Sequence, residues 1–489
     1  MAYLNVFINN SNKNPINVNR DTKPVPPGPG IDKWVKEHMV FWYDMSKPVD
    51  TYSQNFNDWR SHPSVNADII ITSTSFVITR FATLNDTVKC YIPDQTKNFP
   101  GMKVEVKGIV DGQELYWGYS ADVKLVNITQ DGTYDIPPLG TVRGNLSFRN
   151  GNIVGACNIT ITQLPSGQSV PTNEILKANP YLQDFSGNNR PLKLNNFLFA
   201  AMSGVGGYDI SSTNILPDRA NVTVTDNRII HITKKLSTTD NMVNIVPSNS
   251  NPTHKFKVTG LSDGRQVSLV NRNGGFYTFD NGEHEVTLTY PEGTTSLYNA
   301  IGVTGDIGDM DVTIEFLPKY PNALITDGVD DYGVVENFKS LQNYMMFFQC
   351  AIIRPATSKG MFSTTPIEGN IKGWMLLQGN SAKEVRFCNN VYKNFNVTSS
   401  IGDKISYVLS ANNELMTCYV GEEKATLAGT YKQTGANMSL FLSDNNNKTR
   451  FGSMAFYKSI LFNAVPTKQN DGFTEQDLID YVLKNIITQ

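Results

Sequence analysis

The sequence predicts an all-β protein in which two tandem antiparallel β-sandwich modules are followed by a jelly roll with a C-terminal helix. Three observations support this fold class. Short segments alternate apolar with polar residues and are separated by Asn, Gly and Asp. One set of these segments occurs twice, and longer apolar hairpins begin after Pro321. The chain of 489 residues exceeds what one hydrophobic core usually organises, so several domains are expected.

Composition excludes several classes of protein. Charged residues make up 18% of the chain and the formal net charge is -3, so the clustered Lys and Arg of a nucleic-acid-binding protein are missing. No window approaches the roughly 18 apolar residues that cross a bilayer, and the start "MAYLNVFINNSNKN" lacks the features of a secretory signal. We therefore expect that the chain is synthesised in a cytoplasm and does not insert into a membrane. The cysteines lack the spacing of a zinc site or disulfide framework, which indicates reduced, buried thiols; they are Cys90, Cys157, Cys350, Cys388 and Cys418.

Residues 1–64 are expected to form an N-terminal arm and a linker. The stretch "TKPVPPGPG" (22–30) combines Pro, which lacks the backbone donor, with Gly, which lacks a conformational preference, and so indicates a linker. Residues 1–20 contain the short apolar run "YLNVFI" but cannot form a core of their own. They are either a frayed terminus or a strand donated to a neighbouring subunit.

An internal repeat defines the two modules. Three blocks recur in the same order at a nearly constant spacing of about 153 residues, which is hard to explain by chance. The pairs are "ADIIITSTSFVITRF" (67–81) with "ANVTVTDNRIIHITK" (220–234), "KVEVKGIVDGQEL" (103–115) with "KFKVTGLSDGRQV" (255–267), and "CNITITQLP" (157–165) with "MDVTIEFLP" (310–318). Their alternation and turn spacing predict immunoglobulin-like sandwiches at 65–165 and 211–320, joined by a connector at 166–210.

Turn residues repeat with the strands. Asp111-Gly112 in the first module corresponds to Asp263-Gly264 in the second, and Asp131-Gly132 corresponds to Asn281-Gly282. Gly accepts positive φ without steric cost, so each Asp-Gly pair predicts a hairpin turn.

The last third, 321–489, carries many strand–hairpin–strand segments and predicts two packed curved sheets, a jelly roll. One helix ends the chain. Thr474 and Asp477 fit a capping box, which satisfies two free backbone N–H groups at a helix start. An apolar stripe at helical spacing predicts that this helix packs on the jelly roll; its members are Leu478, Ile479, Val482, Leu483 and Ile486.

Two segments of the chain also resemble known families. "ITDGVDDYGVVENF", "KISYVLSANNELMTCYVGEE" and "LFLSDNNNKTRFGSMAFYKSILFNAVPTKQ" resemble the laminin-G and concanavalin A-like lectin/glucanase jelly rolls, over 321–489. "NPYLQDFSGNNRPLKLNNFLFAAMSGVGGYD" (179–209) is similar to a segment of fibre and other virion surface proteins of tailed phages of gut Bacteroidales, the crAss-like phages among them. The first resemblance implies a concanavalin A-like fold with glycan binding, and the second implies a virion protein.

Four carboxylates open the last third: Asp327, Asp330, Asp331 and Glu336. Asp side chains bond the backbone ahead of them in tight turns, so these residues predict a turn that starts a β domain. Calcium, which prefers carboxylate and carbonyl oxygens, is the competing interpretation, although the spacing does not match D-x-[DN]-x-[DN]-G. We assign no metal ligand and no cofactor.

Catalysis is not expected. Glucanases of the resembled class carry an E-x-D-x-(x)-E strand, and 321–489 has none; "EQDLID" (475–480) falls on the predicted helix. Asp309, Asp311 and Glu315 share one strand face, which indicates a solvated surface because the first module has Ala156, Asn158 and Thr162 there. Trp117 is the candidate for an exposed glycan-binding aromatic, with core packing as the alternative.

Together with the resemblances, these features predict a non-enzymatic structural component of a bacteriophage virion, a head or tail fibre or decoration protein that attaches to host surface glycans. Its partners would be other virion proteins and further copies of the chain, as a homotrimer by analogy with phage fibres, and it would be assembled in the cytoplasm of the host bacterium. The alternatives are a polysaccharide depolymerase and a bacterial surface glycan-binding protein.

Overall fold

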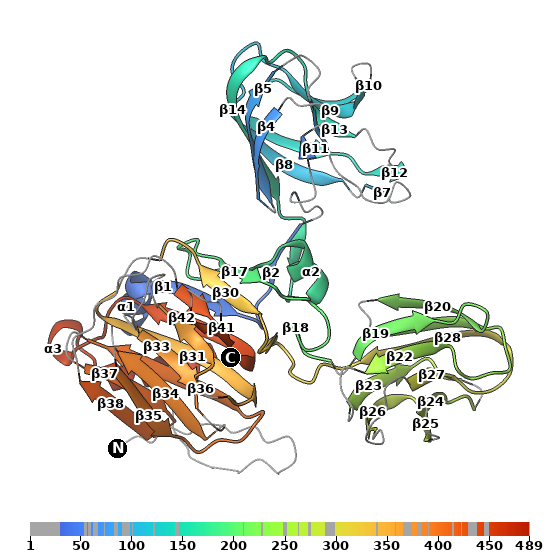
Figure 1. Ribbon diagram of the computed structural model, residues 1–489. Helices are drawn as coiled ribbons and strands as arrows, with labels where there is room; N and C mark the ends of the chain where they lie inside the picture. Colours follow the sequence, from blue (N-terminus) through green and yellow to red (C-terminus); the bar gives the residue numbers. More distant parts are fainter. Residues whose placement is uncertain are drawn as a thin grey trace. The chain divides into compact units, whose positions relative to one another are not determined.

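Antiparallel β-strands form nearly all regular structure in the computed structural model, which confirms the predicted fold class (Figure 1). One compact unit is Lys47–Pro180, and the described residues before and after it form the other. The structure describes residues 30–52, 56, 60–61, 67–72, 74–82, 87–89, 98–99, 101–120, 123–141, 146–208, 210–225, 228–247, 252–262, 264–271, 275–288, 299–338, 341–356, 358–364, 374–379, 381, 383–389, 391–412, 415–421, 423–428, 438–444 and 449–488. None of the described helices is long and apolar enough to cross a membrane.

Module 1, the sandwich within Lys47–Pro180, consists of two five-stranded sheets. The first sheet has the order β3 (Arg60–Ser61), β6 (Thr87–Lys89), β13 (Ser147–Asn150), β9 (Leu115–Ser120) and β10 (Val123–Ile128). The second has the order β4 (Ala67–Ile71), β5 (Ser75–Phe81), β14 (Gly155–Leu164), β8 (Met102–Lys107) and β11 (Gly132–Ile136). Two short strands, β7 (Asn98–Phe99) and β12 (Leu139–Thr141), pair separately. Aromatic side chains dominate the core, where the Trp117 ring lies 4.8 Å from Phe148 and 5.4 Å from Phe99.

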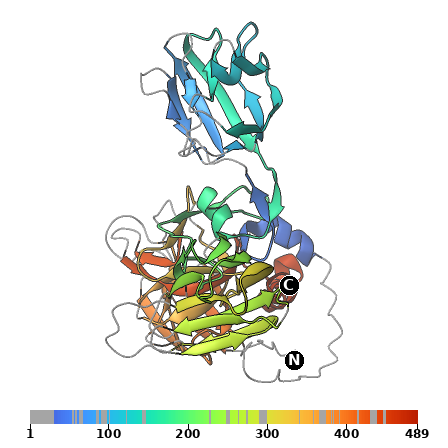
Figure 2. The same ribbon diagram turned by 90° about the vertical axis from the view of Figure 1, so that its right-hand side faces the viewer.

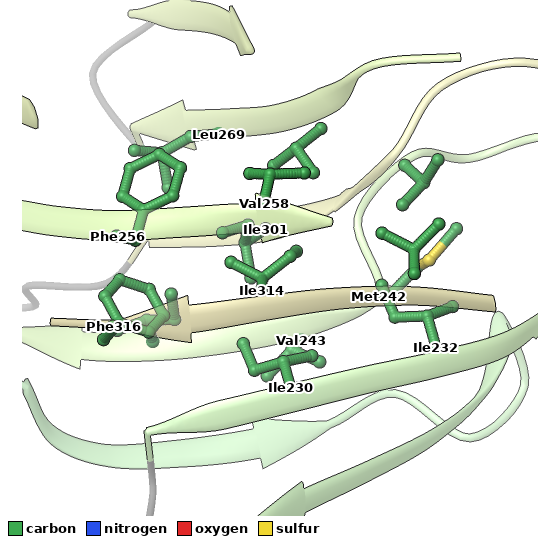
Figure 3. Packing of buried hydrophobic residues seen from close by; sticks show 14 of the residues in the cluster. Ile230, Ile232, Met242, Val243, Phe256, Val258, Leu269, Ile301, Ile314 and Phe316 are labelled. Carbon is green, nitrogen blue, oxygen red and sulfur yellow. The ribbon is translucent and has the colours of Figure 1, made fainter. Parts of the chain in front are cut away.

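Module 2 is a second sandwich of two five-stranded sheets. The first sheet has the order β19 (Ile210–Ile215), β22 (Val243–Pro247), β27 (Asn299–Val303), β24 (Val267–Asn271) and β25 (Phe276–Phe279). The second has the order β20 (Ala220–Thr225), β21 (Ile229–Lys235), β28 (Gly308–Phe316), β23 (Thr253–Thr259) and β26 (Gly282–Thr287). Figure 3 shows how Ile230, Phe256 and Ile314 of one sheet face Val243, Leu269 and Ile301 of the other.

The repeat seen in the sequence is therefore a repeat of topology, because the strands of both modules follow the same order in both sheets. Gly108 and Gly260 occupy the same place and both have positive φ, at 95° and 87°. A Cβ atom at either position would lie about 2 Å from a carbonyl oxygen of the last strand, that of Asn158 or of Asp311. Only glycine permits this close approach of two backbones.

The predicted Asp-Gly turns are only partly correct. Gly112 and Gly264 have positive φ, at 81° and 70°, as expected. However, the strands that each turn joins, β8 to β9 and β23 to β24, belong to different sheets, so the turns cross the sandwich and do not close hairpins. Sequence patterns locate a turn, whereas the sheet that receives the next strand depends on core packing.

The jelly roll contains two eight-stranded sheets. The first has the order β18 (Gly204–Val205), β29 (Leu324–Asp327), β42 (Ser453–Phe462), β31 (Tyr344–Arg354), β36 (Lys404–Ala411), β37 (Leu415–Val420) and β38 (Glu423–Ala428), and β1 (Met39–Asp44) also pairs with β42. The second has the order β16 (Tyr181–Leu182), β17 (Leu192–Asn195), β30 (Tyr332–Val335), β39 (Met438–Leu440), β32 (Gly360–Ser363), β33 (Trp374–Gln378), β34 (Glu384–Asn389) and β35 (Val391–Asn396). A short pair, β40 (Leu442–Asp444) and β41 (Thr449–Phe451), adds to the fold.

The N-terminal part of the described chain belongs to this jelly roll, contrary to the arm expected for 1–64. Along one edge of β42, β29 pairs with residues 453–456 and β1 pairs with residues 458–462. The helix α1 (Ile31–His38) precedes β1 and packs through Trp34 against Phe462 and Phe473. The arm itself, residues 1–29, lies outside the described residues.

The connector expected at 166–210 also contributes strands to the jelly roll, since β16 and β17 extend one sheet and β18 extends the other. Both modules consequently interrupt the jelly roll, whereas the sequence suggested that they precede it.

Each module joins the rest of the chain through paired incoming and outgoing segments. For module 1, β2 (Val49–Thr51) pairs with β15 (Gly167–Ser169), shortly before the helix α2 (Asn173–Ala178). For module 2, Lys319 and Tyr320 donate backbone hydrogen bonds to Gly207 and Gly206.

The predicted terminal helix is confirmed. After the short helix α3 (Lys468–Asp471), α4 (Glu475–Val482) begins with the expected capping box between Thr474 and Asp477 and continues as a π-helix over Leu483–Ile487. Leu478, Ile479 and Val482 are buried against the sheet, in one cluster with α1. Figure 2 shows α1 (blue) beside the C-terminal helix (red), and Tyr481 donates a hydrogen bond to Asp32 between them. The two ends of the described chain therefore cover the same sheet.

Candidate functional site

The carboxylate turn at 327–331 is the candidate site, because it joins β29 of one jelly-roll sheet to β30 of the other. Asp327 is the last residue of β29 and its Oδ1 accepts hydrogen bonds from Val329 N at 2.7 Å and Asp330 N at 3.4 Å. Gly328 has φ of 78°, and a Cβ there would lie 2.8 Å from the Cβ of Ser453. The turn therefore has the Asp-led geometry that its sequence predicts.

Asp331 is fully buried beneath this turn. Its Oδ2 accepts a hydrogen bond from Asp327 N and its Oδ1 accepts one from Ser203 Oγ, both at 3.0 Å. Burial raises the pKa of Asp331 to about 7, and the charges of Asp327 and Asp330 add to the rise while the two hydrogen bonds oppose it. This carboxyl group consequently titrates near neutral pH.

A loop from a different part of the chain completes the site. Asn196 donates from Nδ2 to the Asp330 carbonyl at 3.1 Å, and Ser203, which binds Asp331, also accepts from Leu198 N at 2.9 Å. Within this loop Asn196, Phe199 and Ala201 have positive φ, at 65°, 51° and 50°. Left-handed backbone at non-glycine residues costs about 1 kcal/mol or more each and concentrates at functional sites. The surrounding contacts must hold this strained loop in place.

Three carboxylates of the turn could together hold a cation. Oxygens of Asp327, Asp330 and Asp331 lie within 4.8 Å of one another, a spacing that suits a hard divalent ion. The hydrogen bonds described above use Asp327 Oδ1 and both oxygens of Asp331. Within the described residues, an ion would draw mainly on Asp327 Oδ2 and the Asp330 carboxylate. The turn is thus explained without an ion, while calcium remains chemically compatible with it.

The other residues singled out by the sequence lie elsewhere. Glu336 is in contact with Lys193 at 3.2 Å and raises the pKa of that lysine through their hydrogen bond, so it is not part of the carboxylate turn. Trp117 is completely buried in module 1. It offers no face to a sugar, and the core-packing interpretation is the correct one.

The acidic face of β28 is a ladder of contacts with basic residues on β21 and with Arg228 directly before it, and the contact with His231 is an ion pair only when the imidazole is protonated. Glu315 lies 2.8 Å from Arg228, Asp311 lies 2.7 Å from His231, and Asp309 lies 3.0 Å from Lys234. Asp309 and Asp311 are more than four-fifths exposed. Each acid thus has a basic partner on β21 or immediately before it, which fits the solvated surface predicted for this face.

Asp477 and the described cysteines have structural roles. Asp477 caps α4, where the hydrogen bonds from Thr474 lower its pKa. Burial raises the pKa of the Cys350 and Cys418 thiols far above the usual range, which disfavours the reactive thiolate. Cys157 is half-buried and its pKa is also raised by burial. These three cysteines are therefore free, unreactive thiols.

Sequence reasoning missed Asn196 and Ser203. Both lie in the segment expected to be a connector, about 130 residues before the carboxylates that they bind. Neither belongs to a spacing motif, and the left-handed residues Phe199 and Ala201 carry no signal in their residue type. The only hint is that the phage-like resemblance covers this stretch.

Comparison with known proteins gives little beyond the fold. No family model matches the chain, and no curated protein matches it. Solved structures with similar features include domains LG4-5 of the mouse laminin α1 chain (10% identity, covering 54% of this chain and 90% of that one, TM-score 0.22). Another is domain 4 of the arabinanase AbnA from Geobacillus stearothermophilus (13% identity, covering 32% of this chain and 75% of that one, TM-score 0.25). A third is Trypanosoma rangeli sialidase (10% identity, covering 88% of this chain and 85% of that one, TM-score 0.27). All three contain β domains, and at these TM-scores the likeness carries no argument about activity.

Proposed function

We propose that this chain is a non-enzymatic structural protein of a tailed-phage virion, a head or tail fibre or decoration protein whose jelly roll attaches to a polysaccharide of the host surface. The observation that carries the proposal is the jelly roll interrupted by two sandwich modules, each joined through paired incoming and outgoing segments. Such modules can vary or extend the molecule while the jelly roll keeps its own core. The resemblance of 179–209 to phage virion proteins falls on strands and the loop that build the jelly roll beside the carboxylate turn.

The carboxylate turn supports binding better than glycoside hydrolysis. Catalytic pairs in glycosidases are two carboxyl groups about 5 to 9.5 Å apart on either side of the scissile bond. Here the three grouped carboxylates come from one turn, and both oxygens of Asp331 are engaged by the fold. Polar turn residues next to exposed Leu198 and Val329, at 72% and 68% exposure, suit a surface contact.

Imaging of purified phage particles with an antibody against the jelly roll tests the virion assignment. We expect labelling at a defined place on each particle, together with a band for the chain in the particle proteome. Absence of the chain from particles would refute the assignment.

Glycan binding is tested with the purified chain on host surface polysaccharide, with and without calcium. We expect binding that weakens at least about tenfold in Asp330→Asn, since Asp330 is exposed and, among the described residues, its carboxylate accepts none of the hydrogen bonds of the turn. Asp309→Asn in module 2 is the matched control and should bind normally. Release of reducing ends that Asp327→Asn abolishes would instead identify a depolymerase.

The oligomeric state is a separate part of the proposal. Weak sugar contacts become useful when several copies act together, so we expect a homotrimer. Light scattering at micromolar concentration measures the mass, and a stable monomer would contradict this part alone.

A further inference from the structure

Edge strands of a sheet expose unpaired backbone groups, so soluble proteins protect them with bulges, charges or short length. The five-stranded sheets of the two modules together present eight such edges, four in each module, among the described strands. Their shared topology allows the edges to be compared in pairs. Seven of the eight carry a protective feature.

In the two five-stranded sheets of module 1, every edge among the described strands is protected. The strand β3 has two residues and one of them is Arg60, while β4 is bulged between Asp68 and Ile69. On β11, Asp135 forms an exposed ion pair with Lys103. The strand β10 has two register shifts and carries Lys124, which is bonded to Glu114 at 2.6 Å.

In module 2 three edges are protected in the same ways. The strands β19 and β20 are both bulged, between residues 210 and 212 and between residues 221 and 222. The strand β26 is regular but has Glu283, His284 and Glu285 in sequence. These charges disfavour pairing with another strand.

The exception is β25, whose sequence is Phe-Tyr-Thr-Phe. It pairs with β24 in a regular register without a bulge, and it contains neither a charge nor proline. Phe276 is 57% exposed and Tyr277 is 37% exposed, on opposite faces of the strand. The Tyr277 ring lies over Gly275, where a Cβ would come within 3.1 Å of it. Among the described residues this edge therefore carries none of the bulges, charges or prolines that protect the other edges.

We propose that β25 is a strand-addition site and that its occupant is the apolar run of the N-terminal arm, residues 3–8, of a second copy of this chain. The described part of a single chain leaves Phe276 exposed, and we assign the added strand to another copy, which makes the assembly depend on concentration. The inference stands on this exposed edge and does not depend on the proposed virion role.

The arm has the properties that this edge requires. Its run Tyr-Leu-Asn-Val-Phe-Ile has no charge and no proline, and four of its six residues are strong strand formers. The 21 residues between the run and Gly30 can span up to about 70 Å when extended, so the run can reach a neighbouring molecule. An uncharged edge matches an uncharged strand, and backbone hydrogen bonds would supply the affinity.

Hydrogen exchange and mass measurement on the full chain test this. In the wild type we expect a concentration-dependent assembly in which the backbone amides of β25 exchange about tenfold or more slower than in the dilute monomer. Val6→Pro removes a backbone donor from the run, and Thr278→Lys gives the exposed position on β25 a charge like that of Lys124 on β10. Both variants should stay monomeric with fast exchange at β25.

Two control variants keep the test specific. Asn12→Pro lies in the arm outside the run, and Leu125→Lys changes the corresponding edge of module 1; both should assemble as the wild type does. The proposal is overturned if exchange at β25 does not depend on concentration. It is also overturned if Thr278→Lys assembles normally while Val6→Pro does not, because the arm would then bind elsewhere.

Discussion

The jelly roll and the two modules are built from the same kind of strand but are held together differently. Each module folds from one continuous stretch around an apolar core and places most of its ion pairs on the surface, although Lys235 of module 2 is buried and paired with Asp240. The jelly roll requires three stretches separated by whole modules, and it ties them together with buried polar groups. Asp44 meets Lys458 at 3.2 Å with both side chains at most 5% exposed, and Ser203 binds the buried Asp331.

This difference shows where polar groups add specificity. In a contiguous module, alternation of apolar residues already specifies which strands meet. In the jelly roll, β1 and β29 share one edge of β42, and the Asp44–Lys458 pair is formed where β1 pairs with residues 458–462. A buried ion pair of this kind selects an arrangement more than it adds stability.

The sharpest test of the comparison is Lys458→Ala. It leaves the Asp44 carboxylate buried without its cation, which should destabilise the jelly roll by about 4 kcal/mol. Hydrogen exchange resolved by segment measures the effect separately in each domain. Module 1 should keep its protection.

The matched control is Lys234→Ala in the exposed ladder of module 2. Surface pairs contribute at most about 1 kcal/mol, so protection of module 2 should barely change. Equal losses in the two variants would show that the jelly roll and the modules do not differ in this respect.

A second test concerns what the modules share. Gly260→Ala would place a Cβ 1.9 Å from the Asp311 carbonyl oxygen at positive φ, and we expect a loss of about 3 kcal/mol in module 2. Gly264→Ala also has positive φ but no atom within 4 Å, so about 1 kcal/mol is expected. Denaturation of both variants, with hydrogen exchange of the backbone amides of module 2, gives the two losses of stability. A similar loss in both would mean that φ alone, and not the backbone contact, requires glycine.

These contrasts explain how much of the fold the sequence could predict. Alternation and the repeated blocks were enough for both sandwiches, since all their strands lie within about 100 residues of one another. The capping box at Thr474 and the stripe of α4 were also found, because helix signals are local. The insertion of the two modules into the jelly roll was not predicted, because β1, β16 and β17 are short and join sheets whose other strands lie far away in sequence.

The candidate site shows the same limit. The Asp327 turn was correctly predicted, since Asp side chains bond the backbone two residues ahead. The burial of Asp331 and its bond to Ser203 depend on the loop at 196–203, which carries no motif. Trp117 could not be placed from its own neighbours in sequence, because "LYWGYS" is compatible with either face of a strand.

The buried Asp331 gives the jelly roll a pH dependence that the modules should lack. Its pKa of about 7 in the folded protein lies above the ordinary value of 3.8, so the folded state binds the proton more tightly. Stability from this group is complete below about pH 4 and is lost as the pH rises to 7, by about 2 kcal/mol between pH 5 and pH 7. Denaturation of the jelly roll at several pH values measures the slope. Asp331→Asn should flatten it, and an unchanged slope would assign it to other groups.

The smallest effect is expected from an interaction that both modules repeat. Asp131 Oδ1 accepts a hydrogen bond from Ile109 N at 2.8 Å, and Asn281 Oδ1 accepts one from Leu261 N at 3.0 Å. Replacing either residue by Ala leaves an exposed loop N–H to water, so each module should lose about 1 kcal/mol. Asp131→Asn should be nearly neutral, because the side chain keeps the accepting oxygen, whereas Asn281→Asp also removes the hydrogen bond that Asn281 Nδ2 donates to the Leu261 carbonyl at 3.0 Å and should cost more. Exchange of the Ile109 and Leu261 amides reports directly on these bonds. If Asp131→Asn destabilised module 1 as much as Asp131→Ala does, the charge of Asp131 would contribute to stability. The two modules would then differ in the turn that is most alike in sequence.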